Sequence, residues 1–303
     1  MDVNWLKDLV EVESKGNFSR AAQARNVSVS SLSRRIQLLE EWANHPLVDR
    51  TSHPIRLTAA GEVLLPVAQA VLSELERVRT RLNPAAQRLP VRFLAPSAVS
   101  VAVFPRLLAA LQGALGALLI NLIPDNFREV IRRFGAGEAE FALYYVCDEF
   151  VPRLPMGRGE SVMIARDVLI PVARSNSARK GSQAKSVRVV VLDDASYLGR
   201  ITKAAMLRHR IEYEVALSGT QILAIRQIVI EGGGMAWLPA SLVAEDLEAH
   251  RLVRVRRDFP SIPFTIHAAR QPFPLSPDHE AVWEKLKEFG EAGRVLDFGE
   301  ALR

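Results

Sequence analysis

The sequence predicts a protein that is α+β overall, with a helical N-terminal segment, a long linker helix and a C-terminal α/β region of two subdomains. Three observations lead to this prediction. Apolar residues recur at helical spacing from Trp5 to Leu39. A longer helix with a narrow apolar seam follows them. After Asn83-Pro84, strand-like and helix-like stretches alternate, which is typical of α/β layers with mainly parallel sheets.

The domain boundaries follow from these changes of pattern. We expect a first domain at residues 1–58, the linker helix at 59–84 and the C-terminal region at 85–303. The C-terminal region contains more strand-like stretches than one compact sheet needs. It therefore divides into subdomain I, at about 89–160 and 269–303, and subdomain II, at about 161–268.

Composition excludes several classes of protein. A hydrophobic content of 49% with 24% charged residues is ordinary for a folded chain and excludes a mainly disordered one. Cys147 is the single cysteine, so an intramolecular disulfide is impossible and a reducing compartment is expected. The first residues lack a secretory signal, and no uncharged apolar run reaches the roughly 18–20 residues that span a bilayer. We expect a cytoplasmic protein without a membrane partner.

The N-terminal segment contains signals for three helices. Apolar residues four apart, from Trp5 to Val10, form the stripe of a first helix, which Gly16-Asn17 ends. Phe18–Ala24 forms a short second helix, and Asn26–Ser28 is the turn after it. A third helix follows with three apolar residues facing inward: Leu32, Ile36 and Leu39.

Charge is one-sided in this segment. From Lys15 to Leu39 the chain has five basic residues and no Asp or Glu. A basic run inside a helical, partly apolar stretch favours a surface that faces phosphates, although a solvated face is the alternative. The following stretch, Pro46 to Leu57, suits a small hairpin or wing, and Thr58 can cap the next helix.

The linker helix has the most regular periodicity of the chain. Its apolar residues are spaced 4, 3, 4, 3 and 4, which is a heptad seam that favours a partner helix and hence a homodimer. The alternative is that the stripe packs on the protein's own core. The seam consists of Leu64, Ala68, Val71, Leu75, Val78 and Leu82.

The N-terminal segment resembles the winged helix-turn-helix of the LysR-type transcriptional regulators. The matching stretches are Asn17–Ala22, Asn26–Ser28, Leu32–Ile36, Leu38–Glu40, Pro46–Arg50 and Leu57–Gly61. The resemblance implies a recognition helix with short polar residues at its start, longer donors one turn later, and a wing that touches the DNA backbone. The expected DNA-binding residues are Ser28, Ser30, Ser31, Ser33, Arg34, Arg35, Arg50, Thr51, His53 and Arg56.

The chain departs from the family pattern at three places. Val29-Ser30-Ser31 stands where the family usually has Gln-Pro-Ala, Asn44 where it has Gly, and Val48 where it has Phe. The absent Gln is a common base or backbone contact, so we expect an operator that differs from the family's usual preference.

The C-terminal region resembles the periplasmic-binding-protein-like sensor fold of the same family. The matches are Pro96-Ser97 with Pro105–Leu108, Phe134–Leu143 and Val229–Pro239. Ligands of such folds bind beyond the carboxyl ends of strands, near helix N-termini. Ser97 can bind a carboxylate or merely cap a helix. The candidate effector residues are Ser97, Ser100, Tyr144, Tyr145, Tyr197, Arg200 and Thr220.

Within the family, Ser196–Arg200 and Gly234–Pro239 most resemble the hypochlorite-responsive branch. Methionine oxidation is therefore an alternative to a small ligand. Core filling is the favoured interpretation of the four methionines beyond Met1, and a buried inert thiol is the favoured interpretation of Cys147. These methionines are Met156, Met163, Met206 and Met235.

Together these patterns predict a DNA-binding transcription regulator controlled by a small-molecule effector or an oxidant. The expected partners are double-stranded operator DNA, a second copy in a homodimer or dimer of dimers, and an unidentified effector, with RNA polymerase left open. We expect no cofactor, because the six histidines lack metal-ligand spacing and Gly232–Gly234 does not fit a phosphate loop. No catalytic arrangement is evident, so an enzyme is not expected. The alternative is a small-molecule-binding protein without a DNA-binding role.

Overall fold

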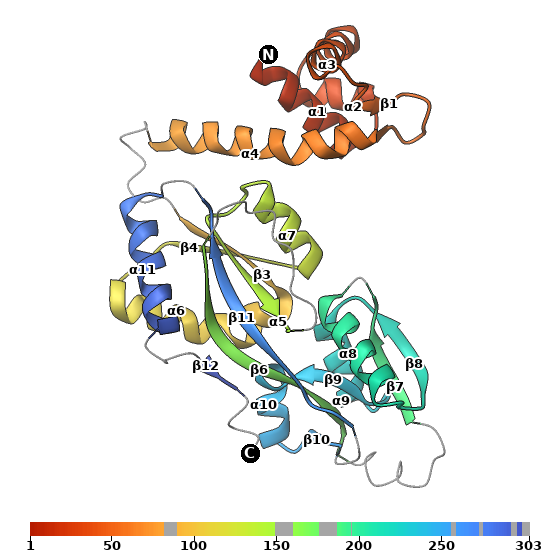
Figure 1. Ribbon diagram of the computed structural model, residues 1–303, viewed down its shortest axis with the longest axis vertical. Coiled ribbons are helices and arrows are strands. Elements are labelled where there is room, and N and C mark those ends of the chain that lie inside the picture. Colours follow the sequence, from red (N-terminus) through yellow and green to blue (C-terminus); the bar gives the residue numbers. More distant parts are fainter. Residues whose placement is uncertain are drawn as a thin grey trace. The chain divides into compact units, whose positions relative to one another are not determined.

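The computed structural model describes residues 1–81, 90–148, 160–175, 187–194, 196–255, 259–272, 275–291 and 296–298. They form two compact units (Figure 1). The N-terminal unit comprises residues 1–89 and 135–138, and the C-terminal unit comprises residues 90–134 and 139–303. Each unit has its own hydrophobic core.

The N-terminal unit begins with the three predicted helices, α1 (Val3–Lys15), α2 (Phe18–Ala24) and α3 (Val29–Ala43). The inward residues predicted for the third helix are confirmed. Leu32, Ile36 and Leu39 are fully buried and pack with the apolar stripe of α1. Burial of this shared core, and not helix propensity, holds such short helices together.

Side-chain caps fix where these helices begin. Asp2, Asn17 and Ser28 accept hydrogen bonds from backbone N–H groups at the starts of α1, α2 and α3. Two residues with left-handed backbone end α1 and α3: Gly16 with φ 58° and Asn44 with φ 53°. Asn tolerates this conformation better than most residues, which explains how it replaces the family's usual Gly at position 44.

The predicted wing is an antiparallel pair of short strands, β1 (Val48–Asp49) and β2 (Arg56–Leu57). Thr58 follows it, and its Oγ1 accepts a hydrogen bond from the Gly61 N–H at 3.2 Å, which confirms the predicted cap. The long helix α4 (Ala59–Arg81) then begins. A Cβ at Gly61 would lie 2.1 Å from the Leu47 carbonyl oxygen, so glycine is what lets α4 approach the wing.

The C-terminal unit is built on an eight-stranded sheet with the strand order β10-β6-β11-β5-β3-β4, to which β9 and β12 are added at β6. A separate pair, β7 and β8, is parallel. The strands are β3 (Val91–Pro96), β4 (Ile120–Asp125), β5 (Phe141–Val146), β6 (Ser161–Arg174), β7 (Val187–Leu192), β8 (Tyr213–Gly219), β9 (Ala236–Pro239), β10 (Leu252–Arg254), β11 (Ile262–Arg270) and β12 (Leu296–Asp297).

Seven helices among the described residues cover these strands. They are α5 (Ser97–Ala102), α6 (Phe104–Leu115), α7 (Phe127–Gly135), α8 (Tyr197–Arg208), α9 (Ile222–Ile230), α10 (Ala240–Glu248) and α11 (Pro277–Glu291). The α/β alternation expected from the sequence is confirmed. No helix within the described ranges is both long and apolar enough to cross a membrane.

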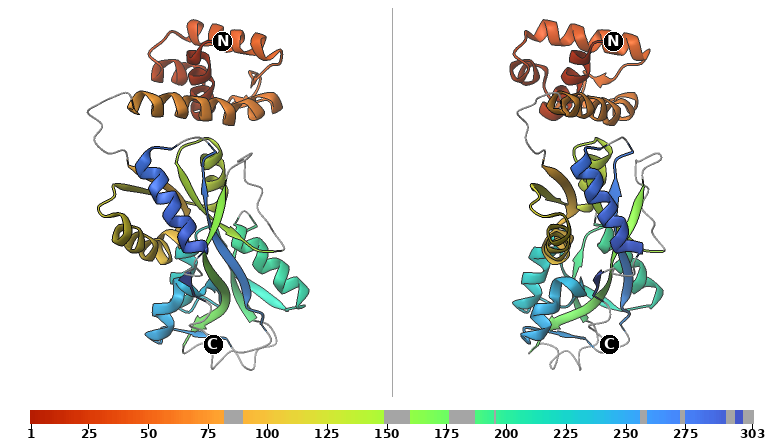
Figure 2. Two further views of the ribbon diagram at one scale, coloured as in Figure 1. Left: turned by 60° about the vertical axis from the view of Figure 1, so that its left-hand side comes forward. Right: turned by 90° about the vertical axis from the view of Figure 1, so that its left-hand side faces the viewer.

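The expectation of mainly parallel sheets is wrong for the large sheet. Its longest strands, β6 and β11, pair antiparallel with each other, and β11 also pairs antiparallel with β5. Figure 2 shows β6 and β11 side by side along much of the unit. A strand that is buried on both faces has the same apolar sequence in either direction, so composition could not decide the pairing.

Those two strands join the two halves of the unit. The first half holds β3, β4 and β5 with α5, α6 and α7, and the second holds β7 and β8 with α8 and α9 (Figure 1). The core of the first half includes Phe93 stacked on Phe141 with ring centroids 5.0 Å apart, and Phe141 stacked on Trp283 at 6.2 Å.

Candidate DNA-binding surface, association surface and effector cleft

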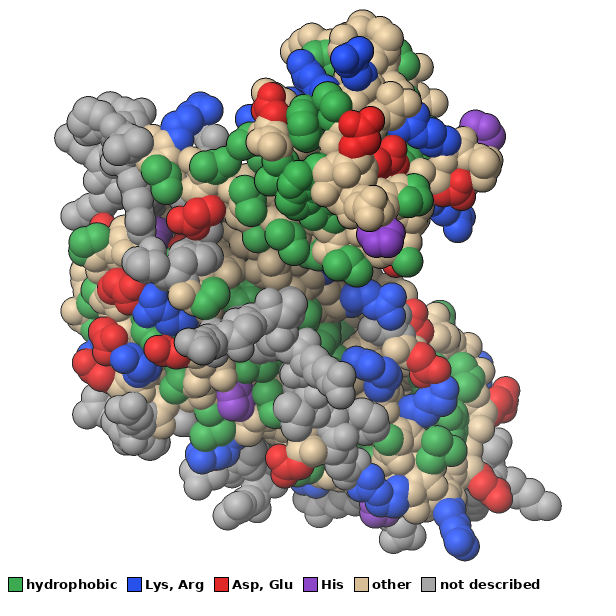
Figure 3. Space-filling model, turned by 45° about the horizontal axis from the view of Figure 1, so that its top comes forward, with side chains coloured by type: hydrophobic (Ala, Val, Ile, Leu, Met, Phe, Trp, Pro, Cys, Tyr) green, Lys and Arg blue, Asp and Glu red, His purple; other side chains and the backbone are tan. Residues whose placement is uncertain are grey.

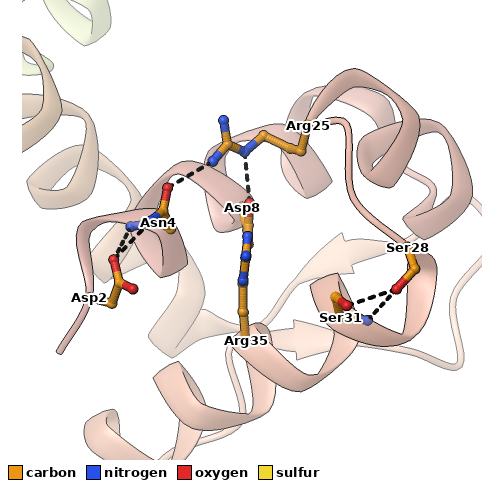
Figure 4. Close-up of polar contacts among 7 residues, drawn as sticks. All are labelled: Asp2, Asn4, Asp8, Arg25, Ser28, Ser31 and Arg35. Atoms are coloured by element: carbon orange, nitrogen blue, oxygen red, sulfur yellow. Dashed lines mark hydrogen bonds and ion pairs between the residues drawn. The ribbon is translucent and has the colours of Figure 1, made fainter.

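The start of α3 presents short polar side chains to solvent (Figure 4). Ser28 Oγ accepts a hydrogen bond from the Ser31 N–H at 3.1 Å and donates to Ser31 Oγ at 2.8 Å. Ser30 and Ser31 are exposed, and Arg34 is exposed one turn later on the same helix. Hydroxyl groups, the free N–H groups of a helix start and a mobile guanidinium together can bind phosphates and base edges.

Two predicted DNA-binding arginines also make contacts with other elements of the unit. Arg35 Nη1 lies 3.4 Å from Asp8 Oδ2, and the Arg35 side chain is 33% exposed. Arg50 donates to Ser33 Oγ at 3.2 Å and to Glu40 Oε2 at 3.1 Å, so it ties the wing to α3.

The remaining predicted residues lie on the wing. Thr51, His53 and Arg56 are all exposed. Thr51 donates its N–H and its hydroxyl to Asp49 Oδ1 at 2.9 and 2.6 Å, and these hydrogen bonds lower the pKa of Asp49 below its usual value. The wing is thus held in one shape by its own side chains while its outer residues remain accessible.

The linker helix uses its two halves differently, and part of the predicted seam is wrong. Ala68 is fully buried in the core of the N-terminal unit and is not available to a second chain, and the partly buried Leu64 packs against the same core. Inward packing of the first half was the alternative interpretation of the stripe. Leu82 lies outside the described residues.

The apolar side chains of α4 that face solvent form a different line, which we call the α4 outer face. Hydrophobic side chains gather along this helix in Figure 3. The line keeps three residues of the predicted seam and adds two that the heptad spacing missed. It consists of Val63, Val67, Val71, Leu75 and Val78, which are 39–73% exposed.

A cavity of about 270 Å³ lies between the two halves of the C-terminal unit. Its lining includes the starts of four helices: α5 at Ser97, α7 at Phe127, α8 at Ser196 and α9 at Gln221. Side chains cap two of them, since Asn126 accepts from the Glu129 N–H and Ser196 from the Gly199 N–H. The starts of α5 and α9 have no side-chain cap. Helix N-termini attract negative charge, so this cleft can bind an anionic group.

Three predicted effector residues line this cleft: Ser97, Tyr145 and Thr220. Ser97 Oγ lies 3.4 Å from the Asp125 carbonyl oxygen, and no cap hydrogen bond from it is present at α5. The capping role considered for Ser97 is therefore not what the structure shows.

Four other predicted effector residues do not line the cleft. Tyr144 follows the alternation of β5 and packs on the opposite face from Tyr145, beside the His267 ring at 5.6 Å. Ser100 donates back to the Pro96 carbonyl at 3.2 Å. Arg200 is exposed, with its guanidinium 5.8 Å from the centroid of the Tyr197 ring.

Tyr197 supports the cleft from behind. It is buried, its ring stacks on Phe127 at 4.6 Å, and its hydroxyl accepts a hydrogen bond from the Cys147 N–H at 2.8 Å. Burial raises the pKa of Tyr197 to about 12 and also raises the pKa of Tyr145. Both phenols therefore stay protonated in the physiological range. The stack joins α7 and β5 of one half to α8 of the other.

Sequence reasoning missed several cleft residues that follow strands. Asp125 is the last residue of β4, Asn126 and Phe127 come directly after it, and Gln221 comes after β8. The rule that ligands bind beyond strand ends could have found them, because polar residues follow both predicted strands. Within the described ranges, no group of three or more His, Cys, Asp or Glu side chains could hold a metal ion.

Comparison with known proteins matches both units. Residues 3–62 match the bacterial regulatory helix-turn-helix proteins of the lysR family, and residues 85–291 match the LysR substrate binding domain. The regulator YjiE of Escherichia coli is 25% identical over 299 residues, covering 95% of each chain. Vibrio fischeri DarR, solved in complex with DNA, is 25% identical with a TM-score of 0.56, covering 95% of this chain and 99% of DarR.

A further solved structure bears on the subfamily. Full-length HypT from Salmonella typhimurium, a hypochlorite-specific LysR-type regulator, is 22% identical with a TM-score of 0.56, covering 96% of this chain and 99% of HypT. A likeness at this identity supports the fold alone. The two family matches together cover most of the sequence, from the helix-turn-helix to the sensor region. The chain therefore belongs to the LysR-type family of DNA-binding transcriptional regulators with an effector-binding domain.

Proposed function

We propose that the start of α3 and the wing bind operator DNA, that the α4 outer face joins a second copy, and that the cleft binds a small anionic effector. The observation that supports the DNA contact is the set of exposed donors at the start of α3: Ser30, Ser31 and Arg34. Half-sites read by paired recognition helices would lie about one helical turn, or a multiple of it, apart.

Arg34→Ala tests the DNA contact. The probe is a duplex selected from random-sequence DNA by binding to the wild-type protein, measured by fluorescence anisotropy over a series of salt concentrations. We expect about a tenfold loss of affinity, as one charge-assisted contact provides. The control is Gln37→Ala on the same helix, which is also exposed but uncharged. Wild-type binding that does not weaken with salt would contradict a phosphate-gripping surface. A selection that yields no bound duplex would favour a small-molecule-binding protein without a DNA-binding role.

The effector class follows from the uncapped starts of α5 and α9. A carboxylate between Ser97 and Thr220 would receive hydroxyl and backbone N–H donors. A thermal-shift screen of small carboxylates against matched amides tests this, because a ligand of the folded state raises its melting temperature. Amides that stabilise the protein as well as the carboxylates do would exclude an anion site. An effector that prefers one conformation of the unit would alter DNA affinity, and operator DNA would alter effector affinity reciprocally.

An oxidant in place of a ligand is the second candidate, because Ser196–Arg200 and Gly234–Pro239 resemble the hypochlorite-responsive branch. Met206 is 2% exposed and lines a cavity of about 340 Å³ between α8 and β7–β8. Oxidation would place a polar sulfoxide in this apolar wall. Hypochlorite that changes DNA binding of the wild type and of Met206→Leu equally would exclude Met206 as the sensor. Cys147 supplies a buried thiol as a further oxidisable group of this unit, and Cys147→Ala tests it in the same way.

The remaining assignments belong to the same proposal. The regulator would act in the cytoplasm, where its DNA lies, as a homodimer or a dimer of dimers, with RNA polymerase as a further partner at the promoter. It would act by binding and not by catalysis. The three-part division at residues 58 and 84 and the two subdomains of the C-terminal region are part of this proposal.

A further inference from the structure

A buried aspartate lies between two arginines in the DNA-binding unit. Asp8 on α1 is fully buried. Its Oδ1 accepts a hydrogen bond from Arg25 Nε at 2.7 Å, and its Oδ2 lies 3.4 Å from Arg35 Nη1. Figure 4 shows the two guanidiniums reaching Asp8 from opposite sides, with Asn4 receiving a second hydrogen bond from Arg25 at 3.3 Å.

The two arginines come from the elements that present the DNA-binding surface. Arg25 ends α2 and precedes the turn to Ser28, while Arg35 is the residue after the exposed Arg34 on α3. Their side chains are 23% and 33% exposed, so neither side chain is fully buried. The contacts with Asp8 and Asn4 use a minority of the N–H donors of each guanidinium.

This geometry has a consequence for charge. The cluster of one carboxylate and two guanidiniums keeps a net positive charge between α1 and the other two helices. A long arginine side chain loses rotamer entropy when it binds phosphate, and an anchor that holds it in place beforehand lowers that loss. The same buried carboxylate ties α1 to the end of α2 and to the middle of α3.

We propose that Asp8 is a positioning residue for DNA binding: it holds Arg25 and Arg35 so that their remaining N–H donors bind the DNA backbone beside the start of α3. The proposal rests on the proposed function, because it requires that α3 faces DNA. The proposal predicts that loss of the Asp8 charge lowers DNA affinity, whereas electrostatics alone predicts that it raises DNA affinity. Removing a negative charge from a DNA-binding surface should strengthen binding, whereas losing this anchor should weaken it.

Asp8→Asn tests the proposal, with Glu13→Gln as the matched control. Both lie on α1 and lose one negative charge, but Glu13 is exposed. The full-length protein is titrated with the selected duplex and with a random-sequence duplex over a series of salt concentrations. We expect Asp8→Asn to weaken binding to both duplexes about tenfold and to make the slope of log affinity against log salt shallower by about one, as for the loss of one phosphate contact. Glu13→Gln should leave affinity unchanged or raise it.

The possible outcomes distinguish failure of the positioning role from failure of the proposed function. Affinity of Asp8→Asn that is equal to or higher than that of the wild type overturns the positioning role. If Asp8→Asn unfolds below the assay temperature, Arg35→Lys is the deciding variant, because it keeps the positive charge but loses the planar guanidinium. Weaker DNA binding by Arg35→Lys with an unchanged melting temperature supports the proposal. Unchanged DNA binding overturns it. A wild type that does not bind either duplex defeats the proposed function itself.

Discussion

The two units of the chain each bury an aspartate between two arginines, yet they use the arrangement for different ends. In the C-terminal unit, Asp246 on α10 is fully buried. Its carboxylate accepts hydrogen bonds from Nε and Nη2 of Arg226 on α9 at 2.6 and 2.9 Å, and its Oδ1 lies 2.6 Å from Arg251 Nη2. Arg226 thereby fastens α9 to α10, and Arg251 fastens the segment before β10 to α10. In the N-terminal unit, the arginines around Asp8 belong to the elements that flank the start of α3.

The C-terminal unit also buries a carboxylate, Asp167, that makes no ion pair with any described residue. Asp167 on β6 accepts hydrogen bonds from the Ser241 N–H and hydroxyl at 3.2 and 2.5 Å and from the Val168 N–H at 2.8 Å. Burial outweighs these donors and raises the pKa of Asp167 to about 6. These buried charges of the sensor unit bind its own helices, whereas the DNA-binding unit keeps the hydrogen-bond donors of α3 and the apolar side chains of the α4 outer face at its surface. Substitutions in the two units should therefore have separable effects.

The largest effect is expected at the α4 outer face. Leu75→Lys places a charge on a side chain that is 46% exposed in the single chain and proposed to pack on a second copy, so we expect monomers. Sedimentation velocity measures the change. Leu119→Lys is the control, since Leu119 is 57% exposed in the C-terminal unit before β4. An intact oligomer of Leu75→Lys would mean that association does not use the N-terminal unit in this way.

The next effect concerns the stability of the sensor unit. Asp246→Ala leaves two arginines without their buried carboxylate, and such a loss destabilises a fold by about 3–5 kcal/mol. Urea unfolding followed by tryptophan fluorescence measures it. Asp194→Ala, which removes an exposed ion pair with Lys203, should cause no measurable change. If Asp246→Ala weakened DNA binding of a fully folded protein, the two units would not be separable.

Asp167 should give this unit a characteristic pH dependence. Its pKa rises from 3.8 in the unfolded chain to about 6 in the fold, so the folded state holds the proton more tightly and the stabilisation is lost as pH rises from about 4 to about 6. The free energy of unfolding of the wild type relative to Asp167→Asn should fall by roughly 2–3 kcal/mol over that range.

The matched control has the opposite sign. The guanidinium of Arg270 lowers the pKa of Glu280, so the stabilisation by Glu280 is present above its usual pKa and is lost as pH falls. Stability of the wild type relative to Glu280→Gln should thus rise with pH. If the difference in free energy of unfolding between wild type and Asp167→Asn did not vary between pH 4 and 7, the raised pKa of Asp167 would be contradicted.

The smallest effect is expected in the cleft. Thr220→Val keeps the shape of the side chain and removes a hydroxyl that faces the cavity, so affinity for a carboxylate identified in the thermal-shift screen should fall about threefold to tenfold. Isothermal titration measures it, with Thr265→Val on β11 outside the cleft as control. DNA affinity without effector should stay the same in both variants, and a change in it would again break the separation of the units.

The local elements of this protein could be predicted from its sequence because they depend on neighbours along the chain. The three N-terminal helices, the wing, the Thr58 cap and the inward side chains Leu32, Ile36 and Leu39 follow from spacing, caps and turn residues. The same holds for Ser97 and Thr220, which follow predicted strands and do line the cleft.

What only the tertiary structure decided depends on residues far apart in the sequence. The antiparallel course of β6 and β11 and the burial of Ala68 were set by partners that no local pattern identifies. Asp8 shows this most plainly, because it meets Arg25 and Arg35 only when three helices pack together. Periodicity predicts which face of a helix or strand is apolar, but packing decides which other element covers that face. The role of a charged side chain depends on its partners across the fold, which the sequence alone does not identify.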